Sequence, residues 1–261
     1  MKRREMTATL AAGAALASVG GATRAARAEE ASNRRPTFAM LVHPNMVLQD
    51  LVGPLTVFNL TMGAVHLVWR DRSPVATDVG VSVIPTTSFA ECPRDVDVLF
   101  VPGGLGGTVA TMDDGPTLAF LRETAARARY VTSVCTGSLL LGAAGLLRDK
   151  RATSHWYVRD LLPHFGAIPT EGRVVEDGNV VTGGGVTAGL DFGLSIAAHL
   201  RGEGWAKRAQ LTLEYDPQPP FAGGTPEKAG PEITADVLKA REPLLARARV
   251  ASERAGARLR G

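Results

Sequence analysis

The sequence predicts an α/β protein in which helices cover both faces of a mostly parallel sheet. Continuous apolar runs, typical of strands buried on both faces, alternate along the chain with segments of helical composition. Glycines, an aspartate and a cysteine lie close to the ends of several of these runs. Parallel sheets bind ligands outside the carboxyl ends of their strands, so we expect these residues to lie together at one edge.

The first half of the chain supplies buried strands separated by helices. Strands are expected at 38–42, 65–69 and 96–101, helices at 50–60 and 116–128, and a β-hairpin over 75–77 and 79–85. Asp50 opens the first helix, where a carboxylate commonly caps free backbone N–H groups. The glycine-rich run 103–107 lacks the lysine of a P-loop and the spacing of a dinucleotide motif, so a turn is expected there.

The second half continues the alternation and ends in a basic helix. Strands are expected at 130–134, 151–154, 174–177 and 179–182, and helices at 136–147, 158–165, 187–200, 204–215 and 233–259. The Asp177-Gly178 pair is typical of a tight turn between two strands. A polar segment rich in proline and glycine, 225–230, is expected to link the last helix to the rest.

Cys135 lies between a β-rich run and a helix, in the sequence YVTSVCTGSLLL. A nucleophile at a sharp strand-to-helix turn is the geometry of a nucleophile elbow. Backbone N–H groups at the start of a helix favour a thiolate and can lower the pKa of a cysteine. The alternative is a structural cysteine that packs as a small hydrophobic residue. The other candidate residues near strand ends favour the nucleophile.

Metal and disulfide chemistry find little support in the sequence. The chain has two cysteines, Cys92 and Cys135, which leave at most one disulfide and exclude a cysteine-rich zinc site. Cys92 precedes a proline in a predicted loop and is expected to be inert. The histidines lack the spacing of metal ligands, so no metal and no other cofactor are expected.

The first 28 residues are expected to be a twin-arginine signal peptide. Basic residues 2–4 precede a weakly apolar stretch at 7–22, and the Ala-Arg-Ala sequence at 26–28 resembles a cleavage site. The stretch is too weakly apolar for a membrane span. Residues 29–35 would then be a linker, and the mature chain would lie in the periplasm or outside the cell. The alternatives are a disordered extension and a cytoplasmic protein.

The charge distribution gives no reason to expect a nucleic-acid partner. The formal net charge is only +3, and the middle of the chain has no basic stripe interleaved with aromatic residues. The arginines concentrate at the two ends: Arg3, Arg4, Arg24, Arg27, Arg34 and Arg35, then Arg241, Arg247, Arg249, Arg254, Arg258 and Arg260.

Six segments, in order, resemble the DJ-1/PfpI superfamily, whose members share a class I glutamine-amidotransferase-like fold. They are Gln49–Pro54, Thr86–Pro93, Ala126–Leu147, Arg151–Trp156, Gly178–Phe192 and Gln210–Phe221. The resemblance implies a flavodoxin-like three-layer sandwich with a cysteine nucleophile elbow. It places the catalytic domain at 36–224, leaves 225–261 as a basic helical tail, and implies a homodimer.

Within the superfamily these segments look most like the isonitrile hydratases. That resemblance implies a lyase that hydrates isonitriles to N-substituted formamides, with Cys135 as nucleophile, Asp50 as general acid and base, and Thr136 as the residue after the nucleophile. Many members of the superfamily carry histidine where this chain has Thr136, which argues against the protease-like and glutaminase-like members. Gln49 and Val52 depart from the expected pattern beside Asp50.

Four more residues are candidates for substrate contacts. Backbone N–H groups of the Gly103-Gly104 pair and of Thr136 are placed to hold developing negative charge. His155 is a candidate for a third catalytic residue, although a histidine beside a tryptophan is more often a pocket or packing residue. Trp156 is a candidate for the substrate pocket, although a single aromatic residue there is more often part of the core. The competing functions are another hydrolase or glyoxalase-like enzyme of the superfamily, a regulator joined to helix-turn-helix units, and a periplasmic ligand or redox sensor.

Overall fold

The computed structural model describes residues 34–261. The expected signal peptide, 1–28, and nearly all of its linker lie outside the described residues. The described chain folds around one seven-stranded sheet with the strand order β10-β11-β7-β6-β1-β2-β5. All neighbours in the sheet run parallel except the β10–β11 pair. The strands are β1 (Thr37–Leu41), β2 (Ala64–Trp69), β5 (Thr87–Ser88), β6 (Val98–Val101), β7 (Tyr130–Val134), β10 (Val174–Asp177) and β11 (Val180–Gly183).

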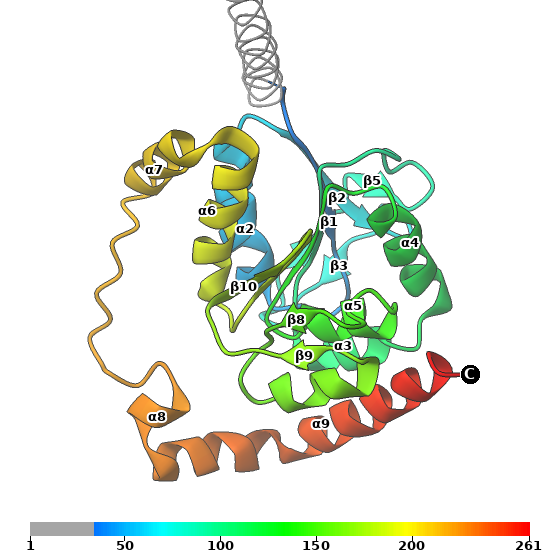
Figure 1. The fold of residues 1–261 in the computed structure, drawn as a ribbon, viewed down its shortest axis with the longest axis vertical. Helices are drawn as coiled ribbons and strands as arrows, with labels where there is room; N and C mark the ends of the chain where they lie inside the picture. The colour runs from blue at the N-terminus through cyan, green and yellow to red at the C-terminus, as the bar shows by residue number, and fades with distance from the viewer. Residues whose placement is uncertain (1–33) are drawn as a thin grey trace, which may run out of the picture.

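Helices cover both faces of this sheet, which confirms the predicted α/β sandwich (Figure 1). The helices α2 (Leu48–Leu60) and α6 (Ala188–Arg201) pack side by side on one face. On the other face lie α3 (Leu105–Thr111), α4 (Gly115–Ala125) and α5 (Gly137–Ala143). The remaining helices are α7 (Glu203–Thr212), the 3₁₀ helix η1 (Arg159–Phe165), α8 (Pro226–Ala229) and α9 (Pro231–Arg258).

The strand order places a topological switch point beside β1. The chain runs from β1 to β2 on one side and later returns to β6 on the other side of β1. At such a point the connections after neighbouring strands diverge, and a crevice opens at their carboxyl ends. The segments after β1, β6 and β7 contain Asp50, Gly103 and Cys135, the residues expected to meet there.

Three local expectations need correction. The glycine-rich run does not form a turn alone: α3 begins at Leu105, because Leu105, Val109 and Met112 form one buried helical face. The helix after Cys135 ends at Ala143 rather than Leu147, followed by a turn with Gly145 at φ 79°. The strand expected at 151–154 is only β8 (Arg151–Ala152), which pairs with β9 (Ile168–Pro169) outside the main sheet.

The predicted hairpin, β3 (Val75–Ala76) with β4 (Ser82–Val83), is confirmed.

An aromatic cluster fixes α2 and α6 on the sheet. Phe58 of α2 stacks on Phe38 of β1 with ring centroids 4.4 Å apart, and it meets Phe100 and Phe192 edge-on at 6.2 and 6.1 Å. All four rings are fully buried. Each contributes roughly 1.5–3 kcal/mol by leaving water. The cluster therefore holds the helix that carries Asp50 in a defined position.

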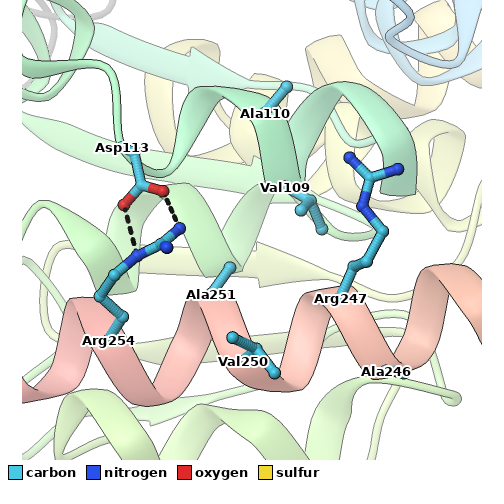
Figure 2. A pocket seen from close by; sticks show the side chains of 8 residues that line it. All are labelled: Val109, Ala110, Asp113, Ala246, Arg247, Val250, Ala251 and Arg254. Atoms are coloured by element: carbon cyan, nitrogen blue, oxygen red, sulfur yellow. Dashed lines mark hydrogen bonds and ion pairs between the residues drawn. The ribbon is translucent and has the colours of Figure 1, made fainter.

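The tail helix α9 lies across one end of the domain (Figure 1). Its small buried residues, Ala248, Ala251, Ala255 and Gly256, let it approach η1, α3 and α5 closely. Figure 2 shows the contact with α3, where Arg254 forms an ion pair with Asp113 beside a groove lined by Val109 and Val250. Among residues 34–261, no helix is both long and apolar enough to cross a membrane.

Candidate active site

Cys135 occupies the sharp turn between β7 and α5. Its φ of 56° is left-handed, a strained conformation for a residue other than glycine. Hydrogen bonds hold it there: its N–H donates to the carbonyls of Gly183 (3.1 Å) and Gly184 (2.8 Å). Its carbonyl accepts from Ser154 Oγ at 2.9 Å and from the His155 N–H at 3.2 Å. The side chain is 1% exposed.

Asp50 lies in the first turn of α2 but does not cap the helix. The N-cap is Val47, and the helix N-terminus instead receives the carboxylate of Asp78, which accepts the Leu48 N–H at 2.9 Å. Asp50 is fully buried, and its Oδ2 accepts the Gly103 N–H at 3.0 Å. Its Oδ1 has no regular hydrogen-bond partner among residues 34–261. The sequence-based capping role for Asp50 is therefore wrong.

Gly103 is the point where the three strand ends converge. A Cβ added to Gly103 would lie 2.8 Å from Asp50 Oδ2, 2.7 Å from Cys135 Cβ and 2.5 Å from the Thr136 nitrogen. These separations are too short for any side chain. The absence of a Cβ here is what lets the carboxyl group of Asp50 lie beside the Cys135 thiol.

The two groups titrate as a coupled pair. Burial raises the pKa of Asp50 to about 7, and hydrogen bonds from Cys135 and the Gly103 N–H partly oppose this shift. Burial, followed by the charge of Asp50, raises the pKa of Cys135 well above its ordinary value. The N–H groups of Thr136 and Val186 act in the opposite direction. Burial and Asp50 therefore outweigh the N–H groups at the helix start, which favour the thiolate.

Thr136 and Gly104 are joined by a hydrogen bond. The Thr136 hydroxyl accepts the Gly104 N–H at 2.9 Å and forms a second hydrogen bond with Thr108 Oγ1 at 2.8 Å. The Gly104 N–H is therefore occupied in this structure, as is the Gly103 N–H on Asp50. The backbone donors that reach the Cys135 sulfur are Thr136 and Val186, and Val186 was not expected from the sequence.

A cavity of about 550 Å³ opens onto Cys135. Most of its wall comes from the loop before α2, the start of α3 and the segment after β8, but α9 contributes Arg241 and Leu244. The tail helix therefore forms part of the cavity. The lining residues are Asn45, Val47, Gln49, Asp78, Gly104, Leu105, Gly106, Cys135, His155, Tyr157, Val186, Arg241 and Leu244.

The His155-Trp156-Tyr157 run is divided between this cavity and a neighbouring one. His155 lines both, Tyr157 lines the Cys135 cavity, and Trp156 lines the second, which has a volume of about 520 Å³. The His155 ring packs on Tyr157 with centroids 3.7 Å apart. Burial and the nearby Arg241 lower the His155 pKa to about 4, so this imidazole is neutral. Its Nδ1 has no partner among the described residues.

These side chains offer nucleophilic and acid–base chemistry. Within residues 34–261, no three histidine, cysteine or acidic side chains gather as metal ligands would. The Cys135 thiol lines the cavity, the carboxyl group of Asp50 is buried beside that thiol with a pKa near neutral pH, and backbone N–H donors lie at the sulfur. Such an arrangement suits covalent catalysis on a small molecule.

Comparisons with known proteins agree with this architecture. Residues 37–199 match the model of the DJ-1/PfpI family. An isonitrile hydratase from Pseudomonas putida is 50% identical over 220 residues, which cover 84% of this chain and 96% of that protein. A solved THiJ/PfpI family protein from Pseudomonas syringae superposes with a TM-score of 0.82 at 50% identity, over 84% of this chain and 91% of that one. DJ-1beta from Drosophila melanogaster shares the fold, with a TM-score of 0.65 at 22% identity, over 70% of this chain and 100% of that one. The chain belongs to the DJ-1/PfpI family.

Proposed function

We propose that this protein hydrates isonitriles to N-substituted formamides. The observation that carries the proposal is its 50% identity to the isonitrile hydratase of Pseudomonas putida across 96% of that protein. Cys135 lines the cavity and Asp50 lies beside its thiol, so this pair would supply the nucleophile and the proton carrier that the reaction needs.

The first half of the proposed reaction uses the proton that Asp50 and Cys135 share. Asp50 gives this proton to the isonitrile carbon while the Cys135 thiolate forms a bond to the same carbon. The products are a neutral thioimidate on Cys135 and an ionised Asp50. The N–H groups of Thr136 and Val186 stabilise the thiolate until it reacts.

The second half releases the formamide. Asp50 removes one proton from water as the water oxygen adds to the thioimidate carbon and the carbon–nitrogen π pair moves onto nitrogen. Nitrogen is protonated, and the new hydroxyl group gives up its proton as the carbonyl group forms, so the second water proton ends on nitrogen. The carbon–sulfur bond breaks in the same collapse, which restores the thiolate beside protonated Asp50. General acid–base catalysis of this kind contributes about 10²–10⁴-fold to the rate.

The raised pKa of Cys135 weighs against a redox sensor. Sensor cysteines react with oxidants as exposed, low-pKa thiolates, whereas this thiol is buried and its pKa is raised. A thiol that ionises only when Asp50 takes its proton fits an enzyme better than an oxidant trap.

The proposal is tested with cyclohexyl isocyanide and the full chain under reducing conditions. We expect wild type to produce N-cyclohexylformamide, detected by mass spectrometry, and Asp50→Asn to lose at least about 10²-fold in kcat because the amide cannot carry the proton. A folded wild-type protein that makes no formamide above the rate in buffer would disprove the isonitrile assignment. An Asp50→Asn variant with unchanged kcat would disprove the acid–base role.

A further inference from the structure

Tyr157 lines the Cys135 cavity and carries a hydroxyl group that the mechanism above does not use. The side chain is partly buried and lines the cavity together with Cys135. Within residues 34–261 its hydroxyl oxygen forms no hydrogen bond. Tyr215, by contrast, donates its hydroxyl proton to Asp191 Oδ1 at 2.9 Å. The Tyr157 hydroxyl therefore remains available to a molecule in the cavity.

The ring of Tyr157 is held on two sides. His155 packs against it at a centroid distance of 3.7 Å, and the Arg241 guanidinium carbon lies 5.5 Å from the ring centroid. These contacts involve the ring rather than the oxygen, so a ligand can engage the hydroxyl without disturbing them. Burial, together with the charges of Cys135 and Asp50, raises the Tyr157 pKa, and the phenol stays protonated.

The hydration step needs a proton at the substrate nitrogen, and the other groups of the cavity are poorly suited to supply it. Asp50 is ionised when the thioimidate forms, and in the next step it accepts a proton from water. His155 is neutral at the pH where the pair reacts, because its pKa is about 4. Arg241 does not release a proton at any relevant pH. Asp78 is already used to cap α2.

We propose that Tyr157 is the catalytic residue that protonates the substrate nitrogen when water adds to the Cys135 thioimidate. This inference rests on the proposed function. As the water oxygen bonds to carbon, the carbon–nitrogen π pair takes the proton of the Tyr157 hydroxyl, and the water proton goes to Asp50. The phenolate then takes the proton of the new hydroxyl group as the carbonyl forms and the carbon–sulfur bond breaks. Tyr157 ends the cycle protonated, with Asp50 protonated and Cys135 a thiolate, as at the start.

The test compares Tyr157→Phe with Tyr130→Phe. Phenylalanine keeps the ring contacts with His155 and Arg241, so Tyr157→Phe removes only the oxygen. Tyr130 begins β7 at the other end of that strand from Cys135, and its ring stacks on His199, so its variant is a matched control. Turnover of cyclohexyl isocyanide and the intact mass of each protein during turnover are measured together.

We expect Tyr157→Phe to lose about 10²-fold in kcat and to accumulate Cys135 bearing the mass of one isonitrile molecule, because adduct formation continues and its hydrolysis slows. Tyr130→Phe should match wild type in both readouts. Turnover by Tyr157→Phe within twofold of wild type would overturn the inference. So would slow turnover without adduct, which would place Tyr157 before the covalent step. If wild type forms neither adduct nor formamide, the proposed function itself has failed.

Discussion

The two cysteines of the chain are both inside the fold, yet their surroundings differ in what can be done with the thiol proton. Burial raises the pKa of Cys92 to about 11, and no charged group contributes to that shift. The pKa of Cys135 is also raised, but the carboxyl group of Asp50 lies beside this thiol. If Cys135 is the nucleophile, as we propose, a raised thiol pKa does not distinguish it from Cys92.

The residue that follows each cysteine sharpens the contrast. Cys92 precedes Pro93, which has no backbone N–H to stabilise a thiolate. Cys135 precedes Thr136, whose N–H reaches the sulfur, and Val186 adds a second donor. In the mechanism that we propose, the difference between the two cysteines is therefore a proton acceptor and N–H donors that meet the sulfur once it is charged. The mechanism does not require a thiolate in the resting protein.

The largest expected effect comes from removing the Cys135 thiol, and removal of the Cys92 thiol is the comparison. Cys135→Ala should lower kcat/KM for cyclohexyl isocyanide by about 10³-fold or more, because the covalent route is lost. Cys92→Ala should leave kcat/KM within twofold of wild type. Equal losses in the two variants would show that the distinction between the two environments has no functional meaning. Circular dichroism spectra of both variants serve as the control for folding.

Gly103→Ala tests whether the closeness of Asp50 and Cys135 matters. The new Cβ would lie within 2.8 Å of Asp50 Oδ2, Cys135 Cβ and the Thr136 nitrogen, so these groups must separate. Misplacing a catalytic group by about 1 Å costs about 10²-fold, and we expect that loss in kcat. Gly115→Ala, where an added Cβ meets nothing within 4 Å, is the matched control. Unchanged kcat in Gly103→Ala would show that the contact is dispensable.

The fold and the position of Cys135 were predictable because they depend on local patterns, whereas the role expected of Asp50 came from the family resemblance. The apolar run 130–134 followed by a helix placed Cys135 at a turn, and the apolar run 96–101 placed Gly103 at a strand end. One further signal was present but not used: Leu105, Val109 and Met112 have helical spacing, and they form the buried face of α3. The spacing of apolar residues was in this case more informative than the glycines between them.

The rest of the site depends on packing between distant parts of the chain. Val186 reaches the sulfur only because β11 pairs with β7, and Arg241 lines the cavity only because α9 docks across the domain. Val186 belongs to the family segment Gly178–Phe192, but neither that motif nor any periodicity near Arg241 indicates which of these residues meets the sulfur or the cavity. The pKa of Cys135 depends on the fold in the same way. The helix start is adjacent in sequence, whereas burial and the charge of Asp50 arise only in the folded chain.

The pH profile tests whether the pair of groups, rather than the thiol alone, controls activity. With the Asp50 pKa at about 7, both groups are protonated below that pH, and the thiolate form of the pair is lost. We therefore expect kcat/KM to rise with pH through about 7 and to be about tenfold lower at pH 6 than its plateau. The residual activity of Asp50→Asn should lack this rise. A wild-type rise centred near the pKa of an ordinary thiol, about 8.5, would contradict coupling to Asp50.

The smallest expected effect comes from removing the Thr136 hydroxyl, which supports the turn that holds the Thr136 N–H. Thr136→Val keeps the backbone donor and the side-chain shape but leaves the buried Gly104 N–H and Thr108 hydroxyl without that partner. We expect the free energy of unfolding to fall by about 2 kcal/mol, measured by urea denaturation, because both groups were desolvated in exchange for these hydrogen bonds. Thr124→Val, in α4, is the control, since Thr124 is a buried residue whose hydroxyl makes no hydrogen bond within residues 34–261. If the two variants lose the same stability, the Thr136 hydroxyl does no more than fill space. If only Thr136→Val is destabilised and its kcat stays within about tenfold of wild type, the hydroxyl supports the turn. The backbone N–H of Thr136, which the turn holds in place, is then the group that the Cys135 sulfur uses and that Cys92 lacks.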